Sequence, residues 1–149
     1  MEKSSRHSKI TGDFGETLMS YWLSKHGFEC AIVDHVGIDI IARRPDSTEV
    51  LGISVKCRSR SEERKSALVR FDREDDPKIL EACKAFGCTP YVGIVADQGS
   101  AVRGFLTSLA HARSLSAGQG WLMSAVKVRE YKADDAIEFF ELQNGDGGW

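Results

Sequence analysis

Two apolar segments joined by a short polar turn constrain the fold of this chain more than any other feature. Residues 37–43 and 49–57 have the composition of β-strands, and the four residues Pro45-Asp46-Ser47-Thr48 between them are typical of a tight turn. A hairpin of two antiparallel strands is therefore expected. The first strand contains one acidic residue, Asp39, and the second contains one lysine, Lys56.

The register of this hairpin decides whether its polar side chains meet. If the loop consists of only the four turn residues, Asp39 lies directly opposite Ser54. A register shifted by two residues places Asp39 opposite Lys56 instead, whereas a shift of one residue turns Asp39 to the other face of the sheet. In the first two cases Asp39, Ser54 and Lys56 share one face, because side chains alternate along a strand.

A helix is predicted before the hairpin, over residues 12–26. Thr11 is a suitable N-cap, Gly27 is a suitable stop, and apolar residues recur between them at helical spacing. Glu16 lies in this helix. A helix glutamate, a strand aspartate and a strand lysine that converge suit a metal-dependent phosphodiesterase, since carboxylates hold Mg²⁺ and a lysine offsets phosphate charge.

The remainder of the chain alternates strands and helices. The patterns predict strands over 28–34, 67–71 and 89–96, a helix from Asp76-Pro77 to residue 87, a helix over about 101–115, and strands over 121–131 and 136–142. This order indicates one α/β domain over residues 1–149 with a mixed sheet. Its core is expected at about 11–96, with 97–142 an appended segment of helix and strands, and flexible tails at 1–9 and 143–149.

Composition bears on the cellular location of the chain. No apolar run approaches the ~20 residues that a membrane span requires, and the N-terminal residues are polar, without the apolar core of a signal peptide. The four cysteines have neither disulfide-framework nor zinc-site spacing. We therefore expect a cytoplasmic protein with reduced cysteines and no membrane contact.

Basic residues gather around and after Lys56. Residues 43–73 contain nine Lys or Arg against five acidic residues, although the whole chain has a net charge of −2. A basic stripe attracts phosphates, so one interpretation is nucleic-acid binding. The other is a solvated loop of mixed charge, and charge alone does not separate the two. The residues expected to bind nucleic acid are Arg58, Arg60, Arg64 and Lys65.

Together these features resemble the PD-(D/E)xK nuclease superfamily, in particular its Holliday junction resolvase-like and restriction-endonuclease-like branches. The resemblance covers about residues 11–96 and is carried by Gly15-Glu16, the strand Gly37–Ala42, the dipeptide Val55-Lys56 and the helix–strand unit 77–96. It implies a restriction-endonuclease-like α/β/α sandwich, DNA as the partner and a homodimer. It also implies catalytic roles for Glu16, Asp39 and Lys56, with Mg²⁺ or Mn²⁺ held by Glu16 and Asp39. Ser54, which shares a strand face with Asp39 and Lys56, is the fourth residue predicted at the catalytic site.

The literal Pro45-Asp46 pair does not belong to this motif. It lies at the hairpin tip, roughly 25 Å from Lys56 at ~3.3 Å per strand residue, too far to share a metal ion.

Ser54 departs from the superfamily pattern, which usually has Glu, Asp or Gln at this position. A carboxylate from elsewhere replaces it, or Glu16 and Asp39 suffice while Ser54 holds a metal-bound water, or the site is degenerate. The acidic residues available as replacements are Asp34, Glu62, Glu63 and Asp72. The sequence accordingly predicts a metal-dependent DNA endonuclease of repair, recombination or restriction type. The alternatives are a catalytically silent relative that binds DNA or a protein partner, and a small domain unrelated to nucleic acid.

Overall fold

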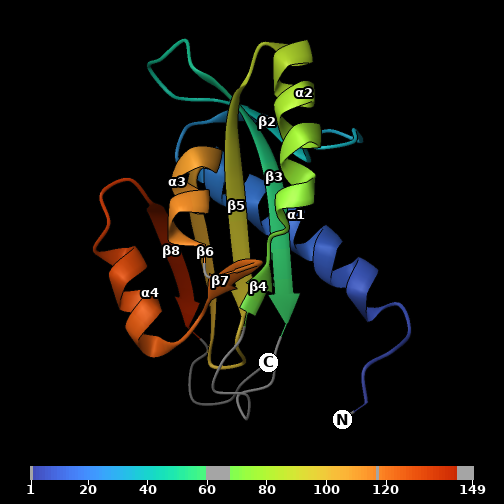
Figure 1. Cartoon of the computed structure of the whole chain (residues 1–149), viewed down its shortest axis with the longest axis vertical. Coiled ribbons are helices and arrows are strands. Elements are labelled where there is room, and N and C mark those ends of the chain that lie inside the picture. The colour runs from blue at the N-terminus through green and yellow to red at the C-terminus, as the bar shows by residue number, and fades with distance from the viewer. Residues whose placement is uncertain (1, 60–67, 117, 144–149) are drawn as a thin grey trace.

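The structure, a computed structural model, describes residues 2–59, 68–116 and 118–143. Within them, six strands form a central mixed sheet in the order β1-β2-β3-β5-β6-β8 (Figure 1). These strands are β1 (Glu29–Ile32), β2 (Ile40–Arg43), β3 (Val50–Ser59), β5 (Thr89–Asp97), β6 (Ala101–Ser108) and β8 (Glu138–Gln143). A second, two-stranded sheet pairs β4 (Leu68–Arg70) with β7 (Gly120–Leu122).

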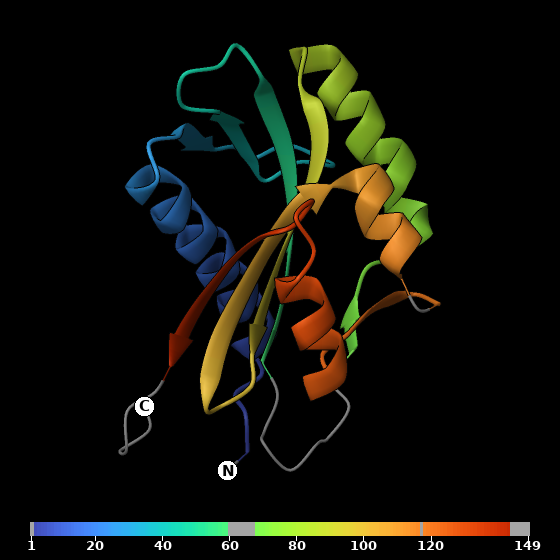
Figure 2. The same ribbon diagram turned by 90° about the vertical axis from the view of Figure 1, so that its left-hand side faces the viewer.

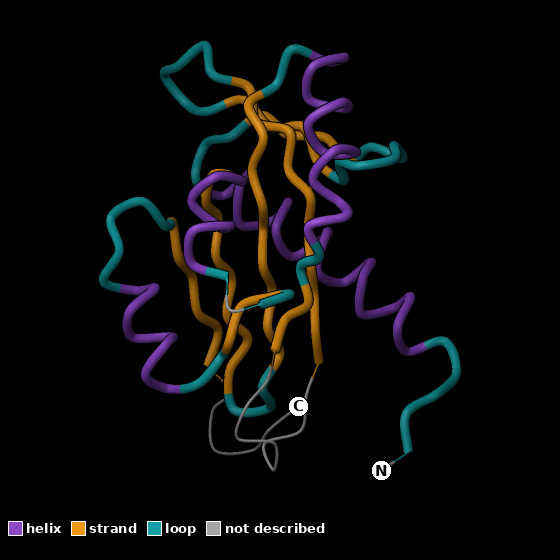
Figure 3. The backbone as a smooth tube through the Cα atoms, viewed as in Figure 1, coloured by secondary structure: helices purple, strands orange, loops and turns teal. Residues whose placement is uncertain are grey.

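Helices cover both faces of the central sheet. The helix α1 (His7–Lys25) lies on one face, and α2 (Asp76–Phe86), α3 (Leu109–Leu115) and α4 (Ala125–Lys132) lie on the other (Figures 1 and 2). Figure 3 distinguishes the strands, in orange, from the helices, in purple, in the same view as Figure 1. The order of elements predicted an α/β domain with a mixed sheet, and the family resemblance implied the α/β/α sandwich. No helix in the described ranges has the length and apolarity that crossing a bilayer would require.

Each face of the sheet has its own apolar core. Under α1, the buried side chains of Met19 and Leu23 pack with Ile40, Ile53 and Leu106. On the other face the core contains aromatic side chains, among them Phe71, Phe105, Trp121 and Tyr131. The alternation of side chains along each strand divides the residues between these two cores.

Strand β3 is the point at which antiparallel and parallel pairing meet. It pairs antiparallel with β2 and parallel with β5. A parallel pair needs a crossover connection, and here it contains β4, a short 3₁₀ helix (Arg73–Asp75) and α2. Because α2 runs back against β3, the first residues of α2 lie beside the second half of that strand.

The hairpin adopts the register that the four-residue turn predicts. Ile40 pairs with Ile53, and the Arg44 amide donates to the Glu49 carbonyl at 3.0 Å. Asp39 immediately precedes β2, and its own amide donates to the Ile53 carbonyl at 2.8 Å. This register therefore brings Asp39 next to Ser54.

Several predicted element boundaries were wrong. The first helix begins at His7, and Thr11 is inside it, where its hydroxyl donates to the His7 carbonyl at 2.7 Å instead of capping. Part of the expected N-terminal tail is thus helical. The expected helix 101–115 is strand β6 followed by α3, which Ser108 caps by accepting from the His111 amide.

The expected strand 121–131 is also wrong. Strand β7 ends at Leu122, and Ser124 caps α4 by accepting from the Lys127 amide. Since β6 and β8 both join the central sheet, the segment 97–142 completes that sheet and is not an addition outside it.

The four cysteines, at positions 30, 57, 83 and 88, are free. Burial raises the pKa of Cys57 to about 12 and that of Cys83 to about 11. A thiol that stays protonated at neutral pH is a poor nucleophile and a poor metal ligand.

Candidate functional site

Three of the four residues predicted to be catalytic lie around one cleft, on the side of the sheet that α2 covers. Asp39, Ser54 and Lys56 line this cleft, which has a volume of about 200 Å³. The other lining residues are Val36, Gly37, Asp75, Lys78 and Ile79. The odd-numbered neighbours on β3, Leu51 and Ile53, are buried in the core beneath α1, as the alternation predicts.

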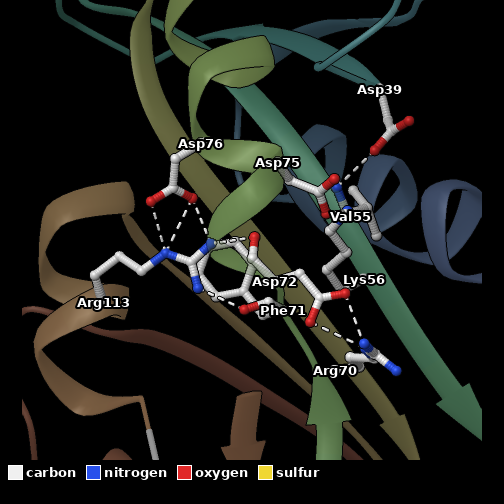
Figure 4. A network of polar contacts seen from close by, with 9 residues as sticks. All are labelled: Asp39, Val55, Lys56, Arg70, Phe71, Asp72, Asp75, Asp76 and Arg113. Atoms are coloured by element: carbon white, nitrogen blue, oxygen red, sulfur yellow. Dashed lines mark hydrogen bonds and ion pairs between the residues drawn. The ribbon is translucent and has the colours of Figure 1, made fainter. Parts of the chain in front are cut away.

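The Asp39 carboxylate is fixed to the neighbouring strand. Its Oδ2 accepts a hydrogen bond from the Val55 amide at 2.7 Å (Figure 4). Burial raises the pKa of Asp39, while the Val55 amide, the positive charge of Lys56 and a hydrogen bond with Glu16 act in the opposite direction. The carboxyl group of Asp39 is therefore fixed in position and partly desolvated.

Glu16 reaches the Asp39 carboxyl group from α1. The helix lies close to β3 because Gly15 has no side chain: a Cβ there would be 2.5 Å from the Cβ of Cys57. Burial, followed by the negative charges of Asp39 and Asp13, raises the pKa of Glu16 to about 7. Near neutral pH, Glu16 and Asp39 thus behave as two adjacent carboxyl groups that resist carrying two negative charges.

Lys56 forms an ion pair that the sequence analysis did not anticipate. Its Nζ lies 3.0 Å from Oδ2 of Asp75, and the side chains are 26% and 33% exposed, respectively. The sequence did contain an indication of Asp75. This residue directly precedes the helix of the β3–β5 crossover, and a crossover helix begins beside the end of the preceding parallel strand. Lys78, in the first turn of α2, is a cationic residue of the cleft that the sequence analysis also missed.

Ser54 occupies the middle of the cleft wall. The residue is only 3% exposed. Among the described residues, none is hydrogen-bonded to its hydroxyl group. This position contributes a small neutral group where the superfamily pattern has an acid or an amide.

The proposed replacements for that acid do not line the cleft where the structure describes them. Asp72 binds Arg70, with both carboxylate oxygens within 2.9 Å of Nε, and Asp34 is exposed in the loop before β2. Of the predicted nucleic-acid-binding residues, Arg58 is exposed near the end of β3. The remaining predicted residues lie outside the described ranges: Arg60, Glu62, Glu63, Arg64 and Lys65.

The chemistry of the cleft suits a hard divalent cation bound by few protein ligands. Within residues 2–59, 68–116 and 118–143, no group of three or more His, Cys, Asp or Glu side chains is placed to hold a metal ion. Mg²⁺ commonly takes one or two carboxylates and completes its octahedron with water and phosphate oxygens. The Glu16–Asp39 pair fits this requirement, since it offers two adjacent carboxyl groups whose raised pKa values a bound cation would lower.

Comparison with known proteins supports the fold assignment. No protein-family model matches the chain, and no curated protein matches it. Among solved structures, the fold is similar to that of Hjc, a Holliday junction resolvase from the archaeal hyperthermophile Archaeoglobus fulgidus. The TM-score is 0.53 over 80% of this chain and 88% of that chain, with 17% identity. The predicted restriction-endonuclease-like fold is thereby confirmed.

Proposed function

We propose that this chain is a member of the PD-(D/E)xK superfamily and a divalent-metal-dependent DNA endonuclease. The observation that carries the proposal is the Glu16–Asp39 carboxyl pair, which stands beside the cleft that Lys56 lines. The likeness to a Holliday junction resolvase favours DNA as the substrate. A repair or recombination role agrees with that likeness, and homodimerisation and a cytoplasmic location stay predictions.

Each residue of the cleft has a distinct part in this proposal. Glu16 and Asp39 would hold Mg²⁺ or Mn²⁺, which when bound polarises the scissile phosphate and acidifies a water molecule. Lys56 supplies positive charge where a phosphate would enter, and Lys78 adds to it at the rim. The Ser54 hydroxyl, which has no partner among the described residues, is free to hydrogen-bond a water molecule.

A cleavage assay tests the proposal. Supercoiled, linear, single-stranded and four-way-junction DNA would each be incubated with the protein and Mg²⁺ or Mn²⁺. We expect cleavage of at least one form that stops when the metal is chelated. If none of the four forms is cut by protein that is folded and metal-loaded, the endonuclease proposal is wrong.

A second candidate is a nuclease-fold protein that binds DNA without cutting it. Two observations favour it: a neutral residue stands at position 54, and the Lys56 ammonium is already paired with Asp75. In that case, binding should still weaken with salt, with a log–log slope of about −0.9 per phosphate contact on duplex DNA. Charge reversal at Arg58, Arg60, Arg64 and Lys65 should reduce that slope, and the cleavage assay should give no product.

The raised pKa of Glu16 predicts that metal binding depends on pH. Because the pKa is about 7, a cation must displace a proton from Glu16 in most molecules below that pH but in few molecules above it. In the absence of metal, the contribution of Glu16 to folding stability changes with pH in the direction opposite to that of an ordinary carboxylate, whose pKa is lowered by folding. The folded chain keeps a proton that the unfolded chain has lost, so stability falls as pH rises from 4.5 to about 7.

Calorimetry of Mn²⁺ binding in two buffers with different ionisation enthalpies measures the proton count. Glu16→Gln should reduce the proton release and weaken binding by at least roughly 10–100-fold, the loss typical when even a residue that only supports a ligand is changed. Asp46→Asn, at the hairpin tip, is the matched control and should behave as the wild type. Proton release that persists unchanged in Glu16→Gln would exclude Glu16 as the titrating ligand.

A further inference from the structure

Arg113, on α3, is the most extensively bonded side chain near the cleft. Its side chain is only 10% exposed. The guanidinium group donates to both carboxylate oxygens of Asp76, to the Phe71 carbonyl and to the Asp72 carbonyl (Figure 4). It also lies over the Phe71 ring, 3.5 Å from the centroid. Strand β7 also contacts the crossover, through its pairing with β4 and through the Gln119 carbonyl, which accepts from the Phe71 amide at 2.7 Å.

These contacts hold both ends of one short segment. Phe71 and Asp72 begin the segment that leads out of β4, and Asp76 begins α2. A guanidinium group has five N–H donors in a rigid plane, which allows it to serve a carboxylate and two carbonyls at once. A lysine at this position has one nitrogen on a flexible stem and cannot reproduce this geometry.

Asp75 lies within the segment that Arg113 holds. Its amide donates to the Asp72 carbonyl at 3.1 Å, and its carboxylate makes the 3.0 Å contact with Lys56. Arg113 takes Asp76 as its acidic partner, so the neighbouring carboxylate of Asp75 is left for Lys56. Lys56 has four rotatable side-chain bonds, and its ion pair with Asp75 restricts them. Asp75 in turn lies in the segment that Arg113 of α3 binds.

We propose that Arg113 and Asp75 are positioning residues: Arg113 fixes the segment 71–76, and Asp75 thereby sets where the Lys56 ammonium stands in the cleft. The inference rests on the proposed function for its effect on catalysis, but the placement of Lys56 does not. It assigns a part in the site to α3, which the sequence analysis placed outside the nuclease-like core.

The first test measures the Lys56 side chain directly. Trace acetylation of the folded protein, read by mass spectrometry, reports the reactivity of each lysine. We expect Lys56 in Arg113→Lys and in Asp75→Asn to react about two- to fivefold faster than in the wild type, the range for losing a partly exposed ion pair. Lys127, which pairs with Glu130 on α4, provides an internal reference within each sample.

Arg103→Lys is the matched control for a general loss of stability. Arg103 is also a partly buried arginine, on β6, and binds Glu141 and Gln98 without contacting the segment 71–76. This variant should lose stability as Arg113→Lys does, yet leave the acetylation of Lys56 unchanged. If Arg113→Lys fails to fold, Asp75→Asn still tests the inference, because Asp75 is at the surface of the cleft.

The second test uses DNA cleavage. In Arg113→Lys and Asp75→Asn, kcat should fall roughly 10–100-fold while KM stays within about twofold, as expected when a reacting group is misplaced. The double variant should lose little more than either single variant, because both changes act on one contact. Arg103→Lys should keep wild-type kcat.

The outcomes separate this inference from the proposed function. Unchanged acetylation of Lys56 in both variants overturns the positioning role, whatever the cleavage assay gives. If the wild type cuts DNA and both variants keep full kcat, the inference is also overturned. If the wild type cuts no DNA, the proposed function fails and acetylation alone decides the positioning of Lys56.

Discussion

Asp39→Asn is expected to reduce metal-dependent DNA cleavage at least roughly 10²–10³-fold while the chain stays folded. An asparagine oxygen can still accept the hydrogen bond from the Val55 amide, so the hairpin keeps its register. The change removes the negative charge that would hold the cation with Glu16. Single-turnover cleavage at saturating Mn²⁺, together with a thermal melt, measures both effects.

Asp46→Asn provides the matched control for this experiment. Asp46 belongs to the literal Pro45-Asp46 pair, and it has a φ of 55° at the hairpin tip. Asparagine tolerates this left-handed conformation, so the substitution removes a charge without straining the turn. Full activity is expected. Loss of cleavage in Asp46→Asn, with activity kept in Asp39→Asn, would reverse our assignment of the catalytic aspartate.

Two glycines of α1 should respond to alanine with opposite signs. Gly12→Ala should raise the free energy of unfolding by about 0.5–1 kcal/mol, because nothing lies within 4 Å of the added Cβ and alanine favours the helix. Gly15→Ala should lower it by about 1–3 kcal/mol, because its Cβ would be 2.5 Å from that of Cys57. Urea denaturation measures both changes.

Gly15→Ala should also reduce Mn²⁺ affinity, since the helix must move away from β3 and takes Glu16 with it. Gly12→Ala should leave Mn²⁺ affinity unchanged. Equal stability of the two variants would mean that α1 does not depend on its close approach at Gly15.

The sequence was sufficient to predict the part of the site that lies on one hairpin. A four-residue turn and alternating side chains determine that Asp39, Ser54 and Lys56 share a face, and the structure confirms this register. These are local relations, which turn geometry and strand periodicity constrain strongly.

Contacts between distant parts of the chain could not be predicted in the same way. Lys56 and Asp75 are 19 residues apart, and Arg113 and Asp76 are 37 residues apart. Neither pair follows from periodicity, because each depends on how the crossover and α3 pack against the sheet. The error at 101–115 has a related cause: an apolar run suits both helix and strand, and pairing with β5 makes its first half a strand.

The close contact of α1 with β3 has a consequence for local unfolding. Glu16 belongs to a helix that packs on one face of the sheet, whereas Asp39 is bonded to the sheet itself. Secondary-structure units can open separately, at a lower free energy than the whole domain. If α1 detaches, Asp39 keeps its bond to Val55 but loses the second carboxyl group. The two carboxyl groups therefore stay adjacent only while this one helix is docked, and a cation bound by both of them would stabilise the docked state.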